Sequence, residues 1–356
     1  MKDRIYVCHT FYHVYVTLLK EFALPKEKQG KATLVLSKMS SDFSGLKEKI
    51  DKEHLFEEVV EFDEKMHTFF PELQKYREDK KNVVFNLINR MIFTKKYAKA
   101  QIPYIPVDFS KYQDIYVFCD LDPIGYYLNY KKIYYHAVED GLNTLVHIDA
   151  ARYDNRGNFK IKQFMAAHNL IFIQNGYSKY CLDMEVNQIE GIKYPIKKHK
   201  EVPRKPLEER LTEEEKSIIT KVFVNDIDKI LGNFKNGEEK KANYIILTEP
   251  LCSLSVRETI FKDMVAMYKD SANITIKPHP RDELDYKKLF PEENVLEKLM
   301  PMEVLNFLPG QPFDKVISVL TETAGIRFAK EKEKLGADFL DKYEAPEVHR
   351  QNETLS

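Results

Sequence analysis

Two short segments of the sequence carry side chains that could move a proton beside a phosphate. In "TIKPHPR", His279 stands between Pro278 and Pro280, with Lys277 and Arg281 on either side. A proline restricts the residue before it to extended geometry, so this imidazole has little conformational freedom. A rigid imidazole between two cations suits a phosphate whose departing oxygen needs a proton or a hydrogen bond. A structural histidine at a strand-to-helix corner is the alternative, but the position at a strand terminus favours the phosphate site.

The second segment, "YYHAVEDG", ends in two adjacent carboxylates, Glu139 and Asp140, followed by Gly141. Adjacent acids repel each other, which raises the pKa of at least one of them and favours a general base near neutral pH. Gly141 permits a tight turn through which a substrate can approach the backbone. A solvated Asp-Gly turn is the alternative for so short a string.

Polar residues also follow two other predicted strands. In "YVCHTFYHVYV", Thr10 follows the first strand, and His13 would lie on the first turn of the next helix, facing a substrate. A hydrogen-bonded core histidine is nearly as common at such a position. Later in the chain, Glu249 and Pro250 follow the strand "YIIL", and Glu258 lies on the helix after it. These residues are candidates because ligands of open α/β sheets bind beyond the carboxyl ends of the strands.

A last predicted strand, "KVISV", leads into a group of hydroxyl side chains. Ser318, Thr321 and Thr323, with the N–H groups of a helix predicted to begin there, would form an anion site. A plain helix N-cap is the alternative. Glu322 lies within this group, and its carboxylate would repel a phosphate unless it faces away.

The elements that must position these residues are short apolar strands alternating with helical stretches. Such alternation is typical of doubly wound parallel sheets, and it is interrupted by a middle rich in Lys, Glu and Pro. We therefore predict an α/β protein of the GT-B class, in which two Rossmann-like domains face each other across a cleft. The predicted parts are an N-terminal domain, a charged helical connection, a C-terminal domain and a helical tail, at residues 1–195, 196–240, 241–330 and 331–356.

Three local patterns refine this picture. Thr212 and Glu215 form a capping-box pair, which predicts that a helix begins there. The carboxylates of Asp282–Asp285 are expected to form a solvated helix start. The apolar run "NLIFIQNG", at 169–176, is expected to be a strand.

Composition excludes several classes of protein. A length of 356 residues suggests two domains, and the balance of 55 Lys+Arg against 56 Asp+Glu argues against a nucleic-acid partner. The sequence has no GxGxxG turn and no Walker motif, which argues against a dinucleotide oxidoreductase and a P-loop NTPase. The four cysteines form no CxxC pair, so we expect free thiols and no metal site. With no apolar segment of spanning length and no cleavage site at its N-terminus, the chain is expected to be cytoplasmic.

Several motifs together resemble the bacterial sialyltransferases of glycosyltransferase family 52, which include lipooligosaccharide and capsule sialyltransferases. The matching features are the acidic turn at Glu139–Gly141, the pair His279 and Pro280, the hydroxyl group near the end, and the opening "YVCHTFYHVYV". Their order and spacing fit from about residue 3 to residue 330. The chain departs from the family at the hydroxyl motif, where "TET" replaces a Ser-Ser/Thr pair and could signal another donor or acceptor.

The resemblance implies an inverting, metal-independent GT-B enzyme with no cofactor, which moves sialic acid from CMP-sialic acid to a terminal sugar, galactose, of a surface glycan. His279 would act on the departing CMP phosphate as general acid or hydrogen-bond donor, and the general base would be Asp140, Glu139 or Glu258. Nucleotide contacts would come from Lys277, Pro280, Arg281, Glu249, Pro250, Ser318, Thr321 and Thr323 in the C-terminal domain. Substrate contacts would come from Thr10, His13 and Gly141 in the N-terminal, acceptor-side domain.

The resemblance also implies partners beyond the donor and the glycan acceptor. Family members form dimers, so a homodimer is expected, and the acceptor would bring the protein to the inner face of the membrane as a peripheral protein. Two alternatives remain. One is another GT-B transferase, using a nucleotide-diphosphate sugar or a CDP-polyol for capsule or wall polymers. The other is a non-catalytic glycan- or nucleotide-binding protein on the same fold.

Overall fold

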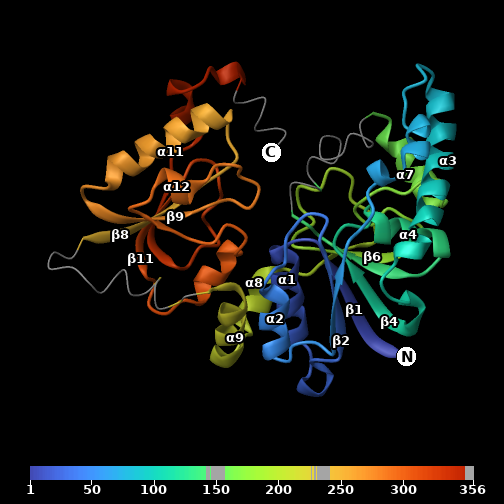
Figure 1. The fold of residues 1–356 in the computed structure, drawn as a ribbon, viewed down its shortest axis with the longest axis horizontal. Helices are drawn as coiled ribbons and strands as arrows, with labels where there is room; N and C mark the ends of the chain where they lie inside the picture. The colour runs from blue at the N-terminus through green and yellow to red at the C-terminus, as the bar shows by residue number, and fades with distance from the viewer. Residues whose placement is uncertain (142–144, 146–156, 226, 228–229, 231–240, 349–356) are drawn as a thin grey trace. The chain divides into compact units, whose positions relative to one another are not determined.

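The computed structural model describes residues 1–141, 145, 157–225, 227, 230 and 241–348. The chain divides into two compact units, Met1–Leu211 and Thr212–Ser356. Each unit is built on one parallel β-sheet with helices packed against it (Figure 1). Among the described residues, no helix is long and apolar enough to cross a membrane.

The first unit contains a seven-stranded sheet in the order β3-β2-β1-β4-β5-β6-β7. Its strands are Lys2–Cys8 (β1), Ala32–Ser37 (β2), Glu58–Phe62 (β3), Tyr112–Val117 (β4), Tyr135–Val138 (β5), Cys181–Val186 (β6) and His199–Glu201 (β7). Its α-helices are Phe11–Phe22 (α1), Leu46–Lys52 (α2), Val83–Gln101 (α3), Pro123–Lys131 (α4), Phe159–Ala167 (α7) and Arg204–Glu209 (α8). Short 3-10 helices lie at Lys26–Lys28, His67–Phe69, Pro71–Tyr76, Ile102–Tyr104 and Phe109–Lys111.

The central strands of this sheet are buried on both faces, as expected for a parallel sheet between helices. Ile5 and Val7 of β1 are fully buried and belong to one core cluster with residues of β4, β5 and β6. Thr10 ends the first β-strand-to-helix turn, because its hydroxyl accepts a hydrogen bond from His13 N at 3.2 Å and caps α1. At the β4–α4 turn only glycine fits position 125, since a Cβ there would lie 2.1 Å from the Asp120 carbonyl oxygen.

The second unit contains a five-stranded parallel sheet in the order β10-β9-β8-β11-β12. Its strands are Ala242–Leu247 (β8), Ala272–Lys277 (β9), Asn294–Val295 (β10), Phe313–Ser318 (β11) and Ala329–Lys334 (β12). Its helices are Glu213–Phe223 (α9), Leu254–Tyr268 (α11), Tyr286–Leu289 (α12) and the 3-10 helices Met302–Phe307 and Ala337–Lys342. The helix α11 packs Ile260, Phe261 and Met264 into the core of this unit.

Two features of the first unit differ from the sequence-based expectation. The unit extends to Leu211, past residue 195, because β7 pairs with β6 and because Glu208 of α8 accepts a hydrogen bond from the Tyr15 hydroxyl. The run at 169–176 is fully buried around Phe172 but is not a strand. Asn175 has a φ of 73°, in the left-handed region, which ends extended geometry there.

The second unit confirms one local prediction and contradicts two. The capping box of Thr212 and Glu215 is present at the start of α9. No helix begins directly after β11 in the described chain, because 321–327 forms turns that lead into β12. The strand β12 therefore stands where the helical tail was expected to begin, and its alternating Lys and Glu side chains suit the edge of a sheet. The last part of that predicted tail, 349–356, lies outside the described residues.

Candidate active site

The imidazole of His279 is fixed just beyond the carboxyl end of β9. Its backbone N–H donates to the Thr248 hydroxyl at 2.9 Å, and its Nδ1 accepts the Arg281 N–H at 3.1 Å. Because Nδ1 is an acceptor, the proton of the neutral ring lies on Nε2. Burial, reinforced by the positive charges of Arg281 and Lys277, lowers the pKa of His279 to about 4. At neutral pH the half-buried ring is therefore a neutral N–H donor.

Asp282, three residues after His279, forms a buried ion pair with Arg257. Asp282 is fully buried and binds Arg257 Nη1 at 2.8 Å, while the hydroxyls of Tyr286 and Thr248 donate to its other oxygen at 2.8 and 3.4 Å. Arg257 also donates to the carbonyl oxygen of Leu251. The expectation of a solvated Asp282 is wrong, although Asp285 does cap α12. Sequence reasoning missed Thr248 and Arg257, and the only local signal was an acid directly after "HPR".

The two cations beside His279 lie in different surroundings. Lys277 is buried, and its Nζ donates to the carbonyl oxygens of Pro278 and Lys298 at 2.7 and 3.0 Å. Burial lowers its pKa to about 7, against the attraction of Glu303 and Glu297. Arg281 and Pro280 are exposed. Of the two predicted cations, Arg281 is therefore the one whose side chain is at the surface.

The predicted anion site after β11 holds a carboxylate of the chain itself. The buried Glu249 side chain accepts the N–H groups of Val319, Leu320 and Thr321 at 2.9 to 3.0 Å. Ser318 donates its hydroxyl to the Thr321 carbonyl oxygen at 3.0 Å. These donors come from turns rather than from a helix N-terminus, so that part of the expectation is wrong. In this arrangement the Glu249 carboxylate and the Ser318 hydroxyl both bind backbone groups of the loop.

The remaining candidates of the second unit lie near the surface. Glu322 is exposed and pairs with Lys334 of β12, while Thr321 and Thr323 are half-buried. Glu258 pairs with Lys262 on the same helix at 2.6 Å, with about 41% of its side chain exposed. Pro250, between Glu249 and Leu251, is half-buried.

In the first unit, the candidates His13 and Asp140 are hydrogen-bonded to each other. His13 is fully buried and stacks on Phe118, with ring centroids 4.2 Å apart. Its Nδ1 accepts the His9 N–H at 3.0 Å, so its Nε2 carries the proton that it donates to Asp140 Oδ1. Burial lowers the pKa of His13, which keeps the ring neutral. The Asp140 side chain is 30% exposed, and Gly141 follows it with a φ of 150°, a backbone conformation that favours glycine.

The neighbouring Glu139 has a structural partner. Its buried carboxylate accepts the Asn187 N–H at 2.7 Å. Burial raises the pKa of Glu139, and Asp140 makes only a smaller contribution in the same direction. The predicted rise in pKa thus occurs in this pair, but desolvation is its main cause. Of the two acids, Asp140 is the one that a substrate can reach.

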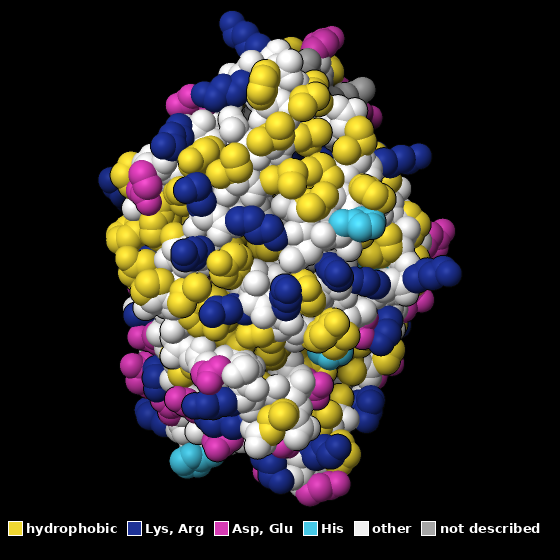
Figure 2. All heavy atoms as spheres, turned by 90° about the vertical axis from the view of Figure 1, so that its right-hand side faces the viewer, with side chains coloured by type: hydrophobic (Ala, Val, Ile, Leu, Met, Phe, Trp, Pro, Cys, Tyr) yellow, Lys and Arg dark blue, Asp and Glu magenta, His cyan; other side chains and the backbone are white. Residues whose placement is uncertain are grey.

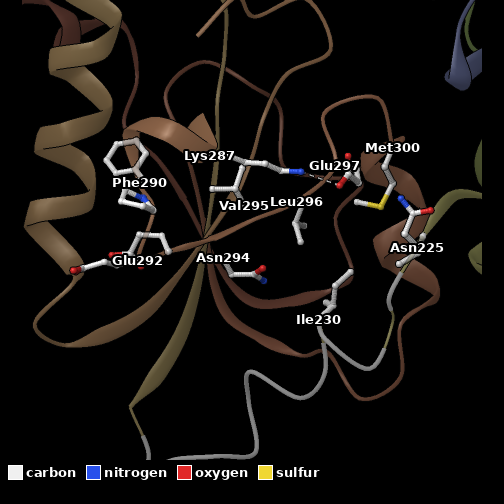
Figure 3. Close-up of a pocket in the computed structure, with 13 residues that line it drawn as sticks. Asn225, Ile230, Lys287, Phe290, Glu292, Asn294, Val295, Leu296, Glu297 and Met300 are labelled. Atoms are coloured by element: carbon white, nitrogen blue, oxygen red, sulfur yellow. Dashed lines mark hydrogen bonds and ion pairs between the residues drawn. The ribbon is translucent and has the colours of Figure 1, made fainter. Parts of the chain in front are cut away.

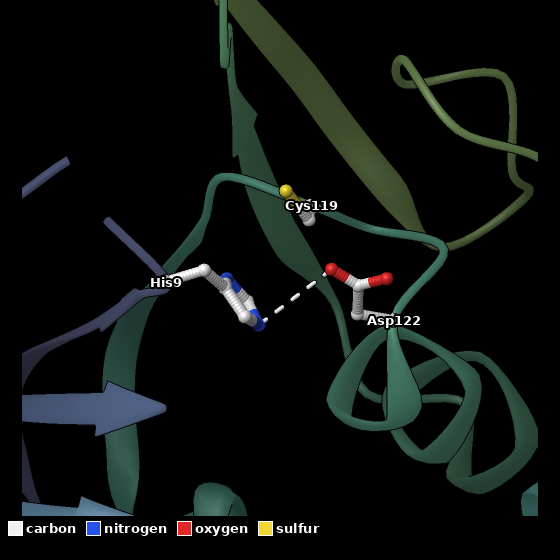
Figure 4. A group of neighbouring side chains, drawn as sticks. All are labelled: His9, Cys119 and Asp122. Carbon is white, nitrogen blue, oxygen red and sulfur yellow. Dashed lines mark ion pairs between the residues drawn. The ribbon is translucent and has the colours of Figure 1, made fainter. Parts of the chain in front are cut away.

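His9, whose N–H donates to His13 Nδ1, forms a buried ion pair with Glu64. His9 Nε2 is 3.2 Å from Glu64 Oε1. It is also 3.7 Å from Asp122 Oδ2 (Figure 4). Burial opposes a charge on this ring, but Glu64 and Asp122 outweigh it and raise the pKa of His9 to about 9. Ligand atoms of His9, Cys119 and Asp122 lie within 4.8 Å of one another, a spacing that a metal ion could use. In the described structure the His9 ring instead pairs with two carboxylates, those of Glu64 and Asp122.

A hollow of about 460 Å³ opens beside β10 (Figure 3). Its lining includes Asn225, Ile230 and Asn294, and none of the residues proposed from the sequence. Lys287 Nζ and Glu297 Oε1, on its rim, pair with each other at 3.0 Å. The candidates lie at or after the carboxyl ends of strands or on the helices that follow them, and none of them lines this hollow.

Comparison with known proteins gives a family and a fold. The sequence matches glycosyltransferase family 52 over residues 63–336. An uncharacterised protein of Haemophilus influenzae is 36% identical over 126 residues, a stretch that covers 34% of this chain and only 38% of that relative.

Solved structures similar to this chain include bacterial sialyltransferases. The 2,6-sialyltransferase of Photobacterium sp. JT-ISH-224, solved with CMP and lactose, has a TM-score of 0.55 at 10% identity, covering 93% of this chain and 71% of its own. The GT-B domain of the Photobacterium damselae sialyltransferase has a TM-score of 0.48 at 12% identity, with coverages of 90% and 86%. The two parallel sheets and the first of these likenesses confirm the predicted GT-B fold class.

Proposed function

The chain belongs to glycosyltransferase family 52, and we propose that it moves sialic acid from CMP-sialic acid to a terminal sugar, galactose, of a surface glycan. The proposal includes inversion at the transferred sugar and no metal ion or cofactor. The observation that carries it is the fixed, neutral imidazole of His279 at the end of β9. Within the described chain no group hydrogen-bonds to its Nε2, so this N–H is available to a ligand.

His279 would act on the departing phosphate. When the bond between the sugar and CMP breaks, negative charge grows on the phosphate oxygen that leaves. A neutral imidazole N–H already in place strengthens its hydrogen bond as that charge develops. Because the pKa of His279 is about 4 in the free protein, we favour a hydrogen-bond donor over an imidazolium acid. The exposed Arg281 would add positive charge on the same side.

Asp140 would take the proton of the acceptor hydroxyl. His13 holds its Oδ1, which fixes the direction of the carboxylate, and the side chain is partly exposed. The rival bases are less suitable, because Glu139 binds the Asn187 N–H and Glu258 is paired with Lys262. Thr10, which caps the helix of His13, and Gly141 would line the acceptor side.

A donor panel tests the proposal. Purified protein is incubated with lactose and with CMP-sialic acid, a UDP-sugar or a CDP-polyol, and both transfer and hydrolysis are followed. We expect turnover with CMP-sialic acid alone. Turnover confined to UDP- or CDP-linked donors would replace this function by another GT-B transferase, which the Glu249 carboxylate after β11 and the "TET" motif would favour. Binding without turnover of any donor would favour the non-catalytic alternative.

The proposed setting is cytoplasmic, with a homodimer as the assembled form. Light scattering after size-exclusion chromatography measures the assembly, and cell fractionation measures the location. A monomer at micromolar concentration or a secreted protein would remove that part of the proposal without touching the reaction.

A further inference from the structure

The backbone at His279 is bound by the side chain of Thr248, the residue that follows β8. The Thr248 hydroxyl accepts the His279 N–H at 2.9 Å. The Thr248 N–H donates to the Lys277 carbonyl oxygen at 3.1 Å. Thr248 is buried, so water has little access to its hydroxyl. These two contacts join the carboxyl ends of β8 and β9 directly beside the imidazole.

Asp282 binds both Thr248 and the other side of the His279 backbone. The Asp282 N–H donates to the His279 carbonyl oxygen at 3.0 Å, which closes a tight turn. The Thr248 hydroxyl has one proton, and Asp282 Oδ2 is its acceptor at 3.4 Å. With its proton directed to this carboxylate, the hydroxyl oxygen has its lone pairs free for the His279 N–H. Both backbone polar groups of His279 are therefore bound, one directly to Asp282 and one through Thr248.

Two helices in turn hold Asp282. Its Oδ1 accepts Arg257 Nη1 of α11 at 2.8 Å, and its Oδ2 accepts the Tyr286 hydroxyl of α12 at 2.8 Å. The Nε and Nη2 of Arg257 donate to the carbonyl oxygens of Leu251 and Cys252 at 2.6 and 3.0 Å. The guanidinium thus connects the loop after β8 with the turn after β9.

The burial of this ion pair indicates a role other than stability. Many Lys and Arg side chains of this protein reach its surface, as on the face shown in Figure 2. Arg257 is instead only 7% exposed, and Asp282 is fully buried. Because removing two charges from water costs free energy, a buried pair need not stabilise a fold more than apolar residues of similar size. Its fixed geometry is suited to orienting the groups that it contacts.

We propose that Thr248, Asp282 and Arg257 are positioning residues for the proposed transfer, acting through His279. Thr248 holds the His279 N–H, Asp282 holds the His279 carbonyl oxygen, and Arg257 holds Asp282. The imidazole then presents its Nε2 proton in one direction before the donor binds, so little reorganisation is needed during the reaction. The inference rests on the proposed function, since it assigns these residues to the same reaction.

Paired variants of the full chain at position 248 test it. Thr248→Val removes the hydroxyl and keeps a similar shape, whereas Thr248→Ser keeps the hydroxyl. We expect Thr248→Val to lower kcat roughly 10- to 100-fold with little change in the KM for CMP-sialic acid. Thr248→Ser should keep kcat within roughly twofold. Thr275→Val is the matched control and should leave kcat unchanged, because this buried threonine of β9 binds Asn294.

A double-mutant cycle shows whether Thr248 acts through His279. In a His279→Ala background, Thr248→Val should lower the residual rate no further, because the imidazole that it positions is gone. The proposal is overturned if Thr248→Val causes the same loss with and without the imidazole. It is also overturned if Thr248→Ser or Thr275→Val loses as much as Thr248→Val, since the loss would then not depend on this hydroxyl.

Arg257→Gln and Asp282→Asn extend the test to the ion pair. Thermal unfolding shows whether each variant is folded, and a folded variant should lose kcat rather than gain KM, as Thr248→Val does. A folded variant with unchanged kcat contradicts the role proposed for the pair. If neither variant folds, the comparison at position 248 still decides the proposal.

A measurement without turnover separates this inference from the proposed function. The nitrogen-15 NMR signals of the His279 ring, identified by their loss in His279→Ala, report which nitrogen carries the proton. We expect Nε2–H alone in the unchanged protein and in Thr248→Ser. Thr248→Val should give both tautomers, because the Arg281 N–H contact at Nδ1 depends on the same turn. Absence of transfer would remove the proposed function, whereas ring signals unchanged in Thr248→Val would overturn the positioning even in an active enzyme.

Discussion

His13 of the first unit and His279 of the second are held in the same way and used differently. In both, Nδ1 accepts a backbone N–H, from His9 and Arg281 respectively, and burial lowers the pKa of the ring. Both rings therefore present a proton on Nε2. In His13 that proton is donated to Asp140, whereas in His279 it has no partner in the described chain. The same tautomer can therefore orient a carboxylate, as in His13, or leave its N–H available to a ligand, as in His279. The difference is whether an acceptor lies beside Nε2.

The comparison predicts the largest loss of activity at His279. His279→Ala should lower the transfer rate by roughly 10²- to 10⁴-fold, because it removes the only donor proposed for the leaving phosphate oxygen. Initial rates with saturating CMP-sialic acid and acceptor measure it. His168→Ala, an exposed histidine of the first unit, serves as the control and should leave the rate unchanged. Equal rates for both variants would remove His279 from the reaction.

A loss of similar kind but smaller size is expected in the first unit. Asp140→Asn keeps the shape of the side chain and removes the base, so the rate should fall roughly 10²-fold. Glu139→Gln and Glu258→Gln should lose less, because the first carboxyl is bound to Asn187 and the second is paired on its helix. His13→Ala should lower kcat more than it raises KM, as befits a positioning residue. A larger loss for Glu258→Gln than for Asp140→Asn would move the base to the second unit.

His9, which is buried beside His13, should affect the stability of the protein rather than its transfer rate. Its pKa in the folded protein, about 9, is above the ordinary value of 6.5, despite the opposing effect of burial. The Glu64 pair therefore stabilises the fold fully below pH 6.5 and loses that contribution as the pH rises through about 9. The difference in unfolding free energy between the unchanged chain and His9→Gln should shrink by roughly 1–3 kcal/mol across that range.

Chemical denaturation at several pH values measures this difference. Lys277, whose pKa is lowered by burial to about 7, changes stability in the opposite direction over part of the range. It is present in both proteins, so its effect cancels in the difference. A difference that stays constant from pH 6.5 to 9 would show that His9 is not charged in the folded protein.

The sequence predicted the features that depend on residues close together in the chain. Proline on both sides of His279 and the capping box at Thr212 are local, and both the fixed imidazole and the helix start are present. It missed what depends on the assembled sheet. Arg257 and Asp282 are 25 residues apart, and Glu249 reaches N–H groups about 70 positions away. Such contacts have no local pattern, because they exist only once β8, β9 and β11 are neighbours.

The failed predictions have a related cause. The run at 169–176 is as apolar as a strand, but an apolar run indicates only that the segment is buried. Asn175 has a left-handed backbone, which is incompatible with the extended geometry of a strand. The segment Ala329–Lys334 is too charged to resemble a central strand, yet it fits the edge of a sheet, where only one side is paired.

The carboxylate of Glu249 gives the loop after β11 its own resident anion. Three backbone N–H groups that could otherwise bind an external anion are already hydrogen-bonded to this side chain. The shape of this loop is therefore held by a contact within the chain. Shortening that single side chain would leave these three N–H groups without their acceptor, so position 249 decides whether the loop carries its own anion.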